Sequence, residues 1–166
     1  ILCGHCRSLL ATLAALRKAT PTADLSIEPR YFPLDSGCNK QMPTSPGDGI
    51  RCLGAKVQIC IEQTPQFWDL REQMFEEQQS LSKEKLMALG SKAMPKDALE
   101  ACIASPKTQA RIDEDVEYAM LFDLKGTPLL LLNGKETPPV APFLYGMVLA
   151  KGDATTKYFA KLPQGR

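Results

Sequence analysis

The sequence is short of the residues on which several common kinds of active site depend. Its 166 residues include only one histidine and one tryptophan. With His5 alone, the chain cannot assemble a Ser-His-Asp catalytic set, and it has no glycine-rich loop of the kind that holds phosphate groups. A zinc site usually draws on two cysteine pairs or on added histidines, and covalent haem attachment needs a histidine where this chain has Arg7. We therefore predict that the protein binds neither a metal ion nor haem.

The chain also lacks an excess of charge of either sign and a long apolar run. Its 20 lysines and arginines nearly balance its 19 aspartates and glutamates, so we expect no nucleic acid or anionic membrane as a partner. No stretch approaches the roughly 18 apolar residues that a membrane span needs. No charged and then apolar leader precedes the first cysteine, so the sequence as given is expected to be soluble and to carry no export signal.

Cysteine, by contrast, is abundant, with six in the chain. An even number above what cytosolic proteins usually keep indicates an oxidising compartment in which disulfides persist. We therefore expect a periplasmic or otherwise extracytoplasmic protein. Since 44% of the residues are apolar and the length suits one core, a single domain over residues 1–166 is expected.

The spacing of apolar residues predicts several helices. Leucines and alanines recur every three or four residues from Cys6 to Lys18, which is typical of an amphipathic helix. Further helices are predicted over residues 50–62, 66–79, 82–92, 95–104, 107–122 and 143–161, the last one broken near Gly152. Acidic residues are expected on the solvated faces of these helices, namely Glu76, Glu77, Asp113, Glu114, Asp115 and Glu117.

Strands are predicted on either side of this helical region. Alternating apolar and polar residues predict an interrupted strand over residues 25–32. The apolar run Leu129–Leu132 has the length of a strand, and the following Asn133-Gly134 pair is a strong signal for a hairpin turn. The chain is therefore predicted to belong to the α/β class.

The Cys3-Gly4-His5-Cys6 motif is the strongest indication of chemistry. The start of a helix places a partial positive charge on the first sulfur, and a His5 imidazolium can stabilise a thiolate there. We therefore predict that Cys3 is the attacking thiol and that Cys6 resolves the mixed disulfide. The cofactor is then the redox-active Cys3–Cys6 disulfide itself. A purely structural disulfide at this motif remains an alternative.

The other four cysteines are expected to form structural disulfides. Cys52 and Cys60 lie eight residues apart on one predicted helix, about 12 Å along its axis, so they cannot bridge each other. Cys38 lies in a loop before that helix and Cys102 in a later helix. The preferred pairing is Cys38–Cys52 with Cys60–Cys102, while the swapped pairing and free buried cysteines stay open.

Taken with the later Gly126-Thr127-Pro128 segment, the apolar strand and the Asn133-Gly134-Lys135 turn, the cysteine motif resembles the thioredoxin superfamily. The closest resemblance is to the DsbA-like branch, in which a helical insertion separates the two halves of the fold. Residues 50–122 have the length and character of that insertion. Residues 31–39 are similar to a stretch of DsbA-like domains linked to vitamin K epoxide reductase homologues.

The resemblance implies a substrate-facing wall and raises two questions. In this family the proline is cis and faces the active-site disulfide, so Thr127 and Pro128, with Gly4, would bind substrate; an ordinary trans proline is the alternative. The family also has a strand directly before its cysteine motif, and this strand is missing or truncated here. The spacer Gly4-His5 matches protein disulfide isomerase, which leaves oxidase and isomerase both open.

The resemblance implies a protein disulfide oxidoreductase or isomerase that acts on unfolded or misoxidised proteins. A membrane quinone-linked redox partner, of the DsbB or vitamin K epoxide reductase type, would reoxidise the Cys3–Cys6 pair. Two alternatives come from other functional classes. One is a disulfide-rich binding or chaperone module that kept the fold without catalysis, and the other is a metal carrier.

Overall fold

The computed structural model describes residues 1–20, 25–45 and 47–153, which divide into two compact units. Unit 1 comprises Ile1–Cys3 and Arg30–Glu117, and unit 2 comprises Gly4–Pro29 and the chain from Tyr118 onward. The expected helical insertion, residues 50–122, lies in unit 1 except for its last five residues.

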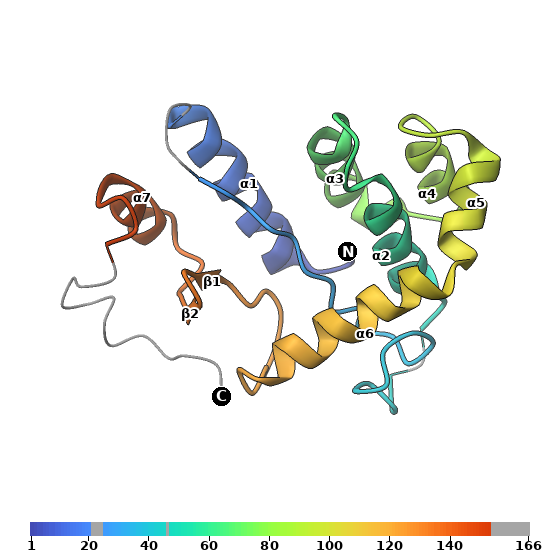
Figure 1. Ribbon diagram of the computed structural model, residues 1–166. Helices are drawn as coiled ribbons and strands as arrows, with labels where there is room; N and C mark the ends of the chain where they lie inside the picture. Colours follow the sequence, from blue (N-terminus) through green and yellow to red (C-terminus); the bar gives the residue numbers. More distant parts are fainter. Residues whose placement is uncertain (21–24, 46, 154–166) are drawn as a thin grey trace. The chain divides into compact units, whose positions relative to one another are not determined.

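The five helices predicted between residues 50 and 122 are confirmed, and they make up most of unit 1 (Figure 1). One of them ends early, because α3 stops at Glu76 and a short 3-10 turn, η1, follows over Gln78–Ser80. The start of α4 is capped by the Ser82 hydroxyl, which accepts a hydrogen bond of 3.3 Å from the Lys85 backbone N–H. The helices are α2 (Ile50–Ile61), α3 (Phe67–Glu76), α4 (Lys83–Gly90), α5 (Lys96–Ala104) and α6 (Pro106–Met120).

The core of unit 1 forms where α2, α4 and α5 pack together. Val57, Leu86 and Leu99 have no exposed surface. Gly90, the last residue of α4, allows this close approach because it has no Cβ. A Cβ there would lie 2.6 Å from Leu99 Cδ2 and 2.9 Å from Val57 Cγ1.

Gly90→Ala is therefore expected to destabilise the protein by about 2 kcal/mol, because the added methyl group forces two packed helices apart. Urea unfolding followed by circular dichroism measures the change. Gly146→Ala is the matched control, since this glycine also lies in a helix and a Cβ there would meet nothing within 4 Å. An unchanged unfolding midpoint for Gly90→Ala would contradict the packing described here.

Two disulfides fasten α2 within unit 1. Cys38 pairs with Cys52 at a Cα–Cα distance of 5.8 Å, and Cys60 pairs with Cys102 at 6.0 Å. This is the preferred one of the two pairings that the sequence left open. The first disulfide joins α2 to the preceding loop, and the second joins it to α5. Both ends of α2 are therefore covalently attached to neighbouring chain.

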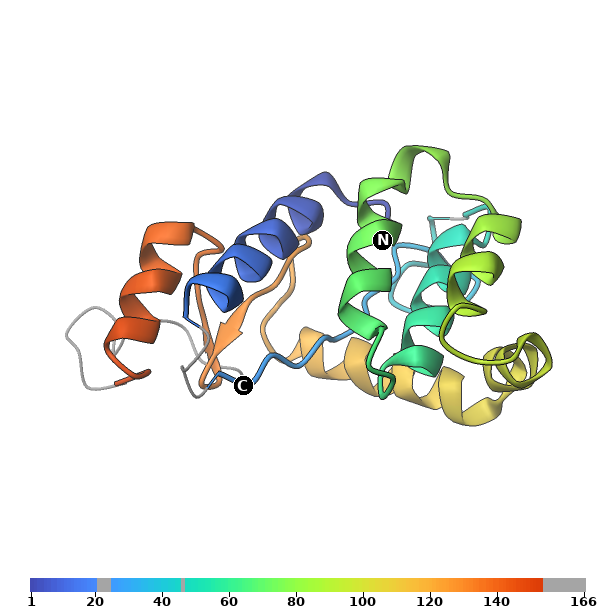
Figure 2. The same cartoon turned by 90° about the horizontal axis from the view of Figure 1, so that it is seen from above.

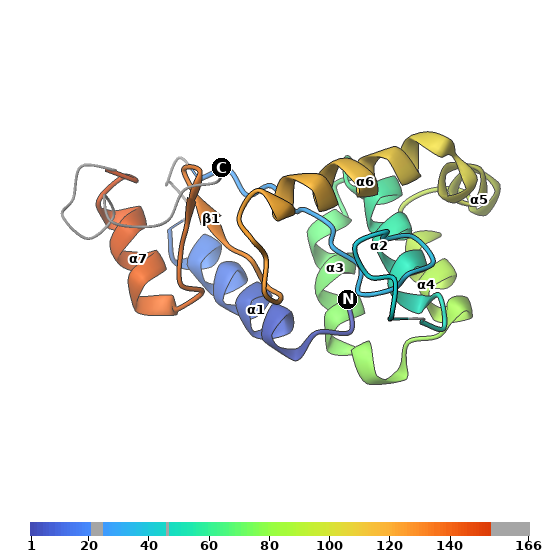
Figure 3. The same cartoon turned by 90° about the horizontal axis from the view of Figure 1, so that it is seen from below.

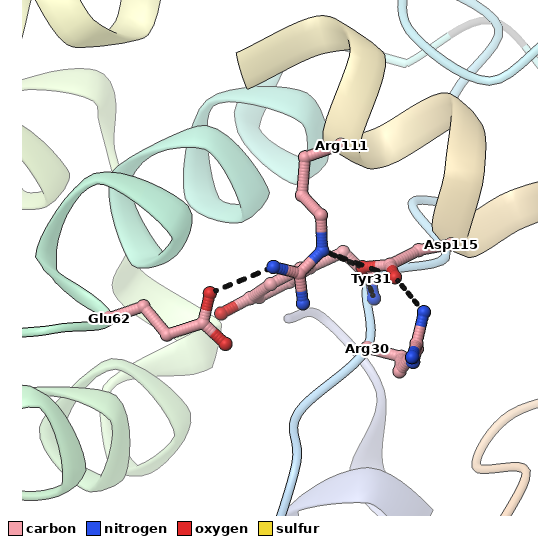
Figure 4. Close-up of polar contacts among 5 residues, drawn as sticks. All are labelled: Arg30, Tyr31, Glu62, Arg111 and Asp115. Carbon is pink, nitrogen blue, oxygen red and sulfur yellow. Dashed lines mark hydrogen bonds and ion pairs between the residues drawn. The ribbon is translucent and has the colours of Figure 1, made fainter. Parts of the chain in front are cut away.

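A buried carboxylate, Asp115, links α6 to the chain that enters unit 1 at Arg30 (Figure 4). Asp115 is only 1% exposed, which corrects the sequence-based prediction of a solvated residue. Its carboxylate accepts hydrogen bonds from Arg30 Nη1 and the Tyr31 backbone N–H, both at 3.0 Å, and from Arg111 Nε at 3.3 Å. Arg111 Nη1 also lies 3.4 Å from the Glu62 carboxylate, at the end of α2. Hydrogen bonds and ion pairs thus replace water around this carboxylate.

The predicted strand over residues 25–32 is wrong, because the described residues 25–45 contain no strand. An extended segment becomes a strand only when its backbone groups pair with those of a neighbour. Here the Tyr31 N–H bonds to a side chain, Asp115, and not to another strand. Burial also raises the pKa of the Tyr31 phenol.

Unit 2 consists of α1 (Gly4–Ala19), a small hairpin and α7 (Ala141–Leu149) (Figure 2). The hairpin pairs β1 (Leu131–Leu132) with β2 (Lys135–Glu136), and its register sets Leu131 opposite Glu136. The turn residues Asn133 and Gly134 have φ values of 49° and 79°, as a tight hairpin requires, so this prediction is confirmed.

The sheet of the described chain is only two-stranded, so this part of the structure is mostly helical and contains less sheet than the predicted α/β class implies. The final helix also differs from the prediction over residues 143–161. It begins at Ala141 and ends at Leu149, followed by left-handed Lys151 and Gly152. Residues 154–161 lie outside the described part of the chain.

Candidate functional site

The cysteine motif lies at the start of α1. Cys3 directly precedes this helix, and Gly4, His5 and Cys6 are its first three residues. The backbone N–H groups of the first turn have no partner within the helix, and no acidic residue occurs in this turn to offset its positive charge. A thiolate at Cys3 would supply the missing negative charge.

Both motif cysteines are disulfide-bonded in the structure. The other four cysteines form the two disulfides of unit 1, and the described chain has no free cysteine. The motif is therefore in its oxidised form. It can accept two electrons and two protons from a pair of thiols.

The spacer of the motif is open to solvent. Gly4 and His5 are exposed, whereas Cys3 and Cys6 are both half-buried. A Cβ at Gly4 would meet nothing within 4 Å, so no side chain or backbone segment of the described residues covers this position.

The Thr127-Pro128 peptide bond is cis. Both residues are half-buried, and the preceding Gly126 is exposed with nothing within 4 Å of the Cβ position. In all three overall views the segment that leads from α6 into β1 passes the N-terminal turn of α1 (Figures 1, 2 and 3). Gly4, His5, Cys6, Thr127 and Pro128 all belong to unit 2, and Cys3 precedes Gly4 in the chain.

A hollow of about 320 Å³ lies beside Pro128 in unit 2. No pattern in the sequence predicts this hollow, because its walls come from a loop and from one residue of β2. Its lining combines apolar side chains with charged ones. The lining residues are Phe122, Asp123, Leu124, Lys125, Gly126, Pro128, Leu129 and Glu136.

The described residues form neither a metal-binding cluster nor a membrane-spanning helix. No three histidine, cysteine, aspartate or glutamate side chains gather there in a way that could hold a metal ion. None of the helices in this part of the chain combines the length and apolar character of a membrane span.

Comparison with known proteins places the chain in a family. A family model described as thioredoxin matches residues 1–142. Neither the curated proteins nor the solved structures gave a match. Since the matched region covers 142 of the 166 residues, the chain belongs to the thioredoxin family.

Proposed function

We propose that this protein is a thiol–disulfide oxidoreductase that exchanges disulfides with protein substrates through Cys3 and Cys6. The observation that carries the proposal is the oxidised cysteine pair at the start of α1, where no acidic side chain offsets the helix charge. Membership of the thioredoxin family implies the same kind of chemistry.

In the oxidising direction, a thiolate of the substrate protein, here called the client, attacks the Cys3 sulfur. The Cys3–Cys6 bond breaks, its electron pair leaves with Cys6, and a mixed disulfide forms between client and Cys3. A second client thiolate then attacks the client sulfur of that mixed disulfide and releases Cys3 as a thiolate. The client gains a disulfide, and the protein gains two electrons and, on protonation, two protons. The same steps in reverse reduce or rearrange a client disulfide.

Thr127 and Pro128 supply the wall on which the client chain lies. The segment that leads from α6 into β1, to which both residues belong, runs past the N-terminal turn of α1 (Figure 3). Gly4 and Gly126 are both exposed. An extended peptide can pair with backbone groups at such an open edge. The wall thus holds the client through the client's backbone.

The protein is proposed to act outside the cytoplasm, on unfolded or misoxidised proteins. Two further disulfides in unit 1 are of the kind that persists in an oxidising compartment. A chain that oxidises clients must itself be reoxidised, and a membrane quinone-linked partner of the DsbB or vitamin K epoxide reductase type would do this. The Gly4-His5 spacer suits isomerase as well as oxidase chemistry.

The test is the pH dependence of Cys3 alkylation. In protein reduced at the motif, iodoacetamide labelling of Cys3, followed by peptide mapping, is expected to have a midpoint well below the free-thiol value of about 8.5. A midpoint near that value would favour a binding or chaperone module without catalysis. Zinc or copper retained through purification would favour a metal carrier.

In the His5→Ala variant, the pH midpoint of Cys3 alkylation is expected to rise by roughly one unit, because the thiolate loses a neighbouring cation. The reduced form is then less stable, and the reduction potential should fall by about 30 mV. Equilibration with glutathione measures this potential. Ser8→Ala is the control, since within the described residues the Ser8 hydroxyl donates its one hydrogen bond to the Gly4 carbonyl, at 3.2 Å. Equal reduction potentials for His5→Ala and Ser8→Ala would show that His5 does not stabilise the Cys3 thiolate.

A further inference from the structure

The hollow beside Pro128 has a lining that suits one particular kind of client side chain. Its volume, about 320 Å³, lies at the lower end of the range for ligand pockets and suits one long side chain better than a cofactor. Phe122, Leu124, Pro128 and Leu129 provide apolar surface. All of its lining residues belong to unit 2, so the hollow is complete within that unit.

The hairpin register explains how an acidic residue reaches this hollow. Glu136 on β2 lies directly opposite Leu131 on β1, so the two side chains project from the same face of the hairpin. Leu129, two residues before Leu131, lines the hollow together with Glu136. The backbone position of Glu136 is therefore fixed by strand pairing and not by a loop.

The charges around the hollow do not cancel. Lys125 and Asp123 form an ion pair with each other at 2.7 Å, and both side chains are exposed. Glu136 is half-buried, and within the described residues its carboxylate makes no hydrogen bond or ion pair. Among the residues that the structure describes, one negative charge thus remains at an apolar wall without a counterion.

We propose that this hollow is a subsite for a lysine or arginine of the client polypeptide, close to the cysteine that reacts with Cys3. The inference rests on the proposed function and adds a sequence preference to it. The aliphatic stem of the client residue packs against the apolar wall, as long cationic side chains commonly do. Its charged head then pairs with the Glu136 carboxylate.

The test uses peptides with one cysteine and one varied position, scanned on either side of that cysteine. Stopped-flow mixing with the oxidised protein gives second-order rate constants for peptides carrying lysine, methionine or glutamate. At the best position, the lysine peptide should react roughly threefold faster than the methionine peptide, and the glutamate peptide should be slowest. At 0.5 M NaCl the three rates should converge, because salt screens the charge.

Variants of Glu136 assign the preference to this residue. Glu136→Gln should make the lysine and methionine peptides react equally fast, and Glu136→Lys should favour the glutamate peptide. Glu114→Gln, which removes an exposed acid on α6, should keep the wild-type order. The reaction with dithiothreitol, which is too small to reach the hollow and the disulfide together, should be the same in all variants.

Three results would overturn the subsite. The first is equal rates for the three peptides with wild-type protein at every position. The second is an unchanged lysine preference in Glu136→Gln that retains the wild-type circular dichroism spectrum. In both cases a normal reaction with dithiothreitol leaves the proposed function standing. The third is an absence of reaction with dithiothreitol as well as with peptides, which overturns the proposed function and the subsite together.

Discussion

Cys3→Ser is expected to abolish insulin reduction, because serine provides neither a thiolate to attack a client disulfide nor a sulfur to hold the mixed disulfide. Turbidity of precipitating insulin B chain in the presence of dithiothreitol measures the activity. The rate should fall to that of dithiothreitol alone.

Cys6→Ser should behave differently, since Cys3 can still attack. Without an internal thiol to release the client, mixed disulfides accumulate. They appear on non-reducing gels as adducts of higher mass, which a reductant cleaves. This contrast between the two variants is a stronger test than either loss alone, because a misfolded protein would give neither activity nor adducts.

The Cys38→Ser/Cys52→Ser double variant is the matched control. It also removes two cysteines, but from the disulfide that joins α2 to its preceding loop. Insulin reduction should persist at a temperature where circular dichroism shows the variant to be folded. If Cys3→Ser retained activity while this folded double variant lost it, the reactive pair would have to be reassigned.

Asp115→Ala is expected to lower the free energy of unfolding by about 3 kcal/mol. Its side chain has no exposed surface and faces two guanidinium groups, so alanine leaves Arg30 and Arg111 without their shared anion. The estimate lies at the low end for broken buried ion pairs, because the side chains of Arg30 and Arg111 are 41% and 29% exposed. The Tyr31 N–H also loses its acceptor.

Urea unfolding measures the loss, and Glu114→Ala is the control because Glu114 is the exposed neighbour on the same helix. The unfolding midpoint of Asp115→Asn should lie between those of Asp115→Ala and Glu114→Ala, since an amide oxygen can still accept a hydrogen bond from the Tyr31 N–H. A midpoint for Asp115→Ala equal to that of Glu114→Ala would show that the cluster in Figure 4 adds no stability.

Local patterns in the sequence were sufficient for most of the helices and for the hairpin. The leucine spacing after Cys6 predicts α1 because a helix repeats every 3.6 residues, and Asn133-Gly134 predicts the turn because both residues tolerate positive φ. The cysteine motif could be recognised for the same reason, since its two sulfurs, its histidine and its helix start lie within a few residues of one another.

What the sequence did not show depends on partners that are far away along the chain. Asp115 looks like any acid on a polar helix, and its burial follows from Arg30, 85 residues earlier. The segment before Tyr31 alternates like a strand, but a strand also requires a neighbour with which to pair. Glu136 gains its place in the hollow only through the register of the hairpin, which no local pattern marks.

The two disulfides at α2 make the protein dependent on the chemistry proposed for it. Four of its own thiols must be oxidised before the helix is fastened to the loop that contains Cys38 and to α5. A newly made chain is therefore itself a client for some oxidant. Production in a reducing compartment would yield a chain without these two disulfides. Preparation of the active protein therefore requires either export to an oxidising compartment or oxidative refolding.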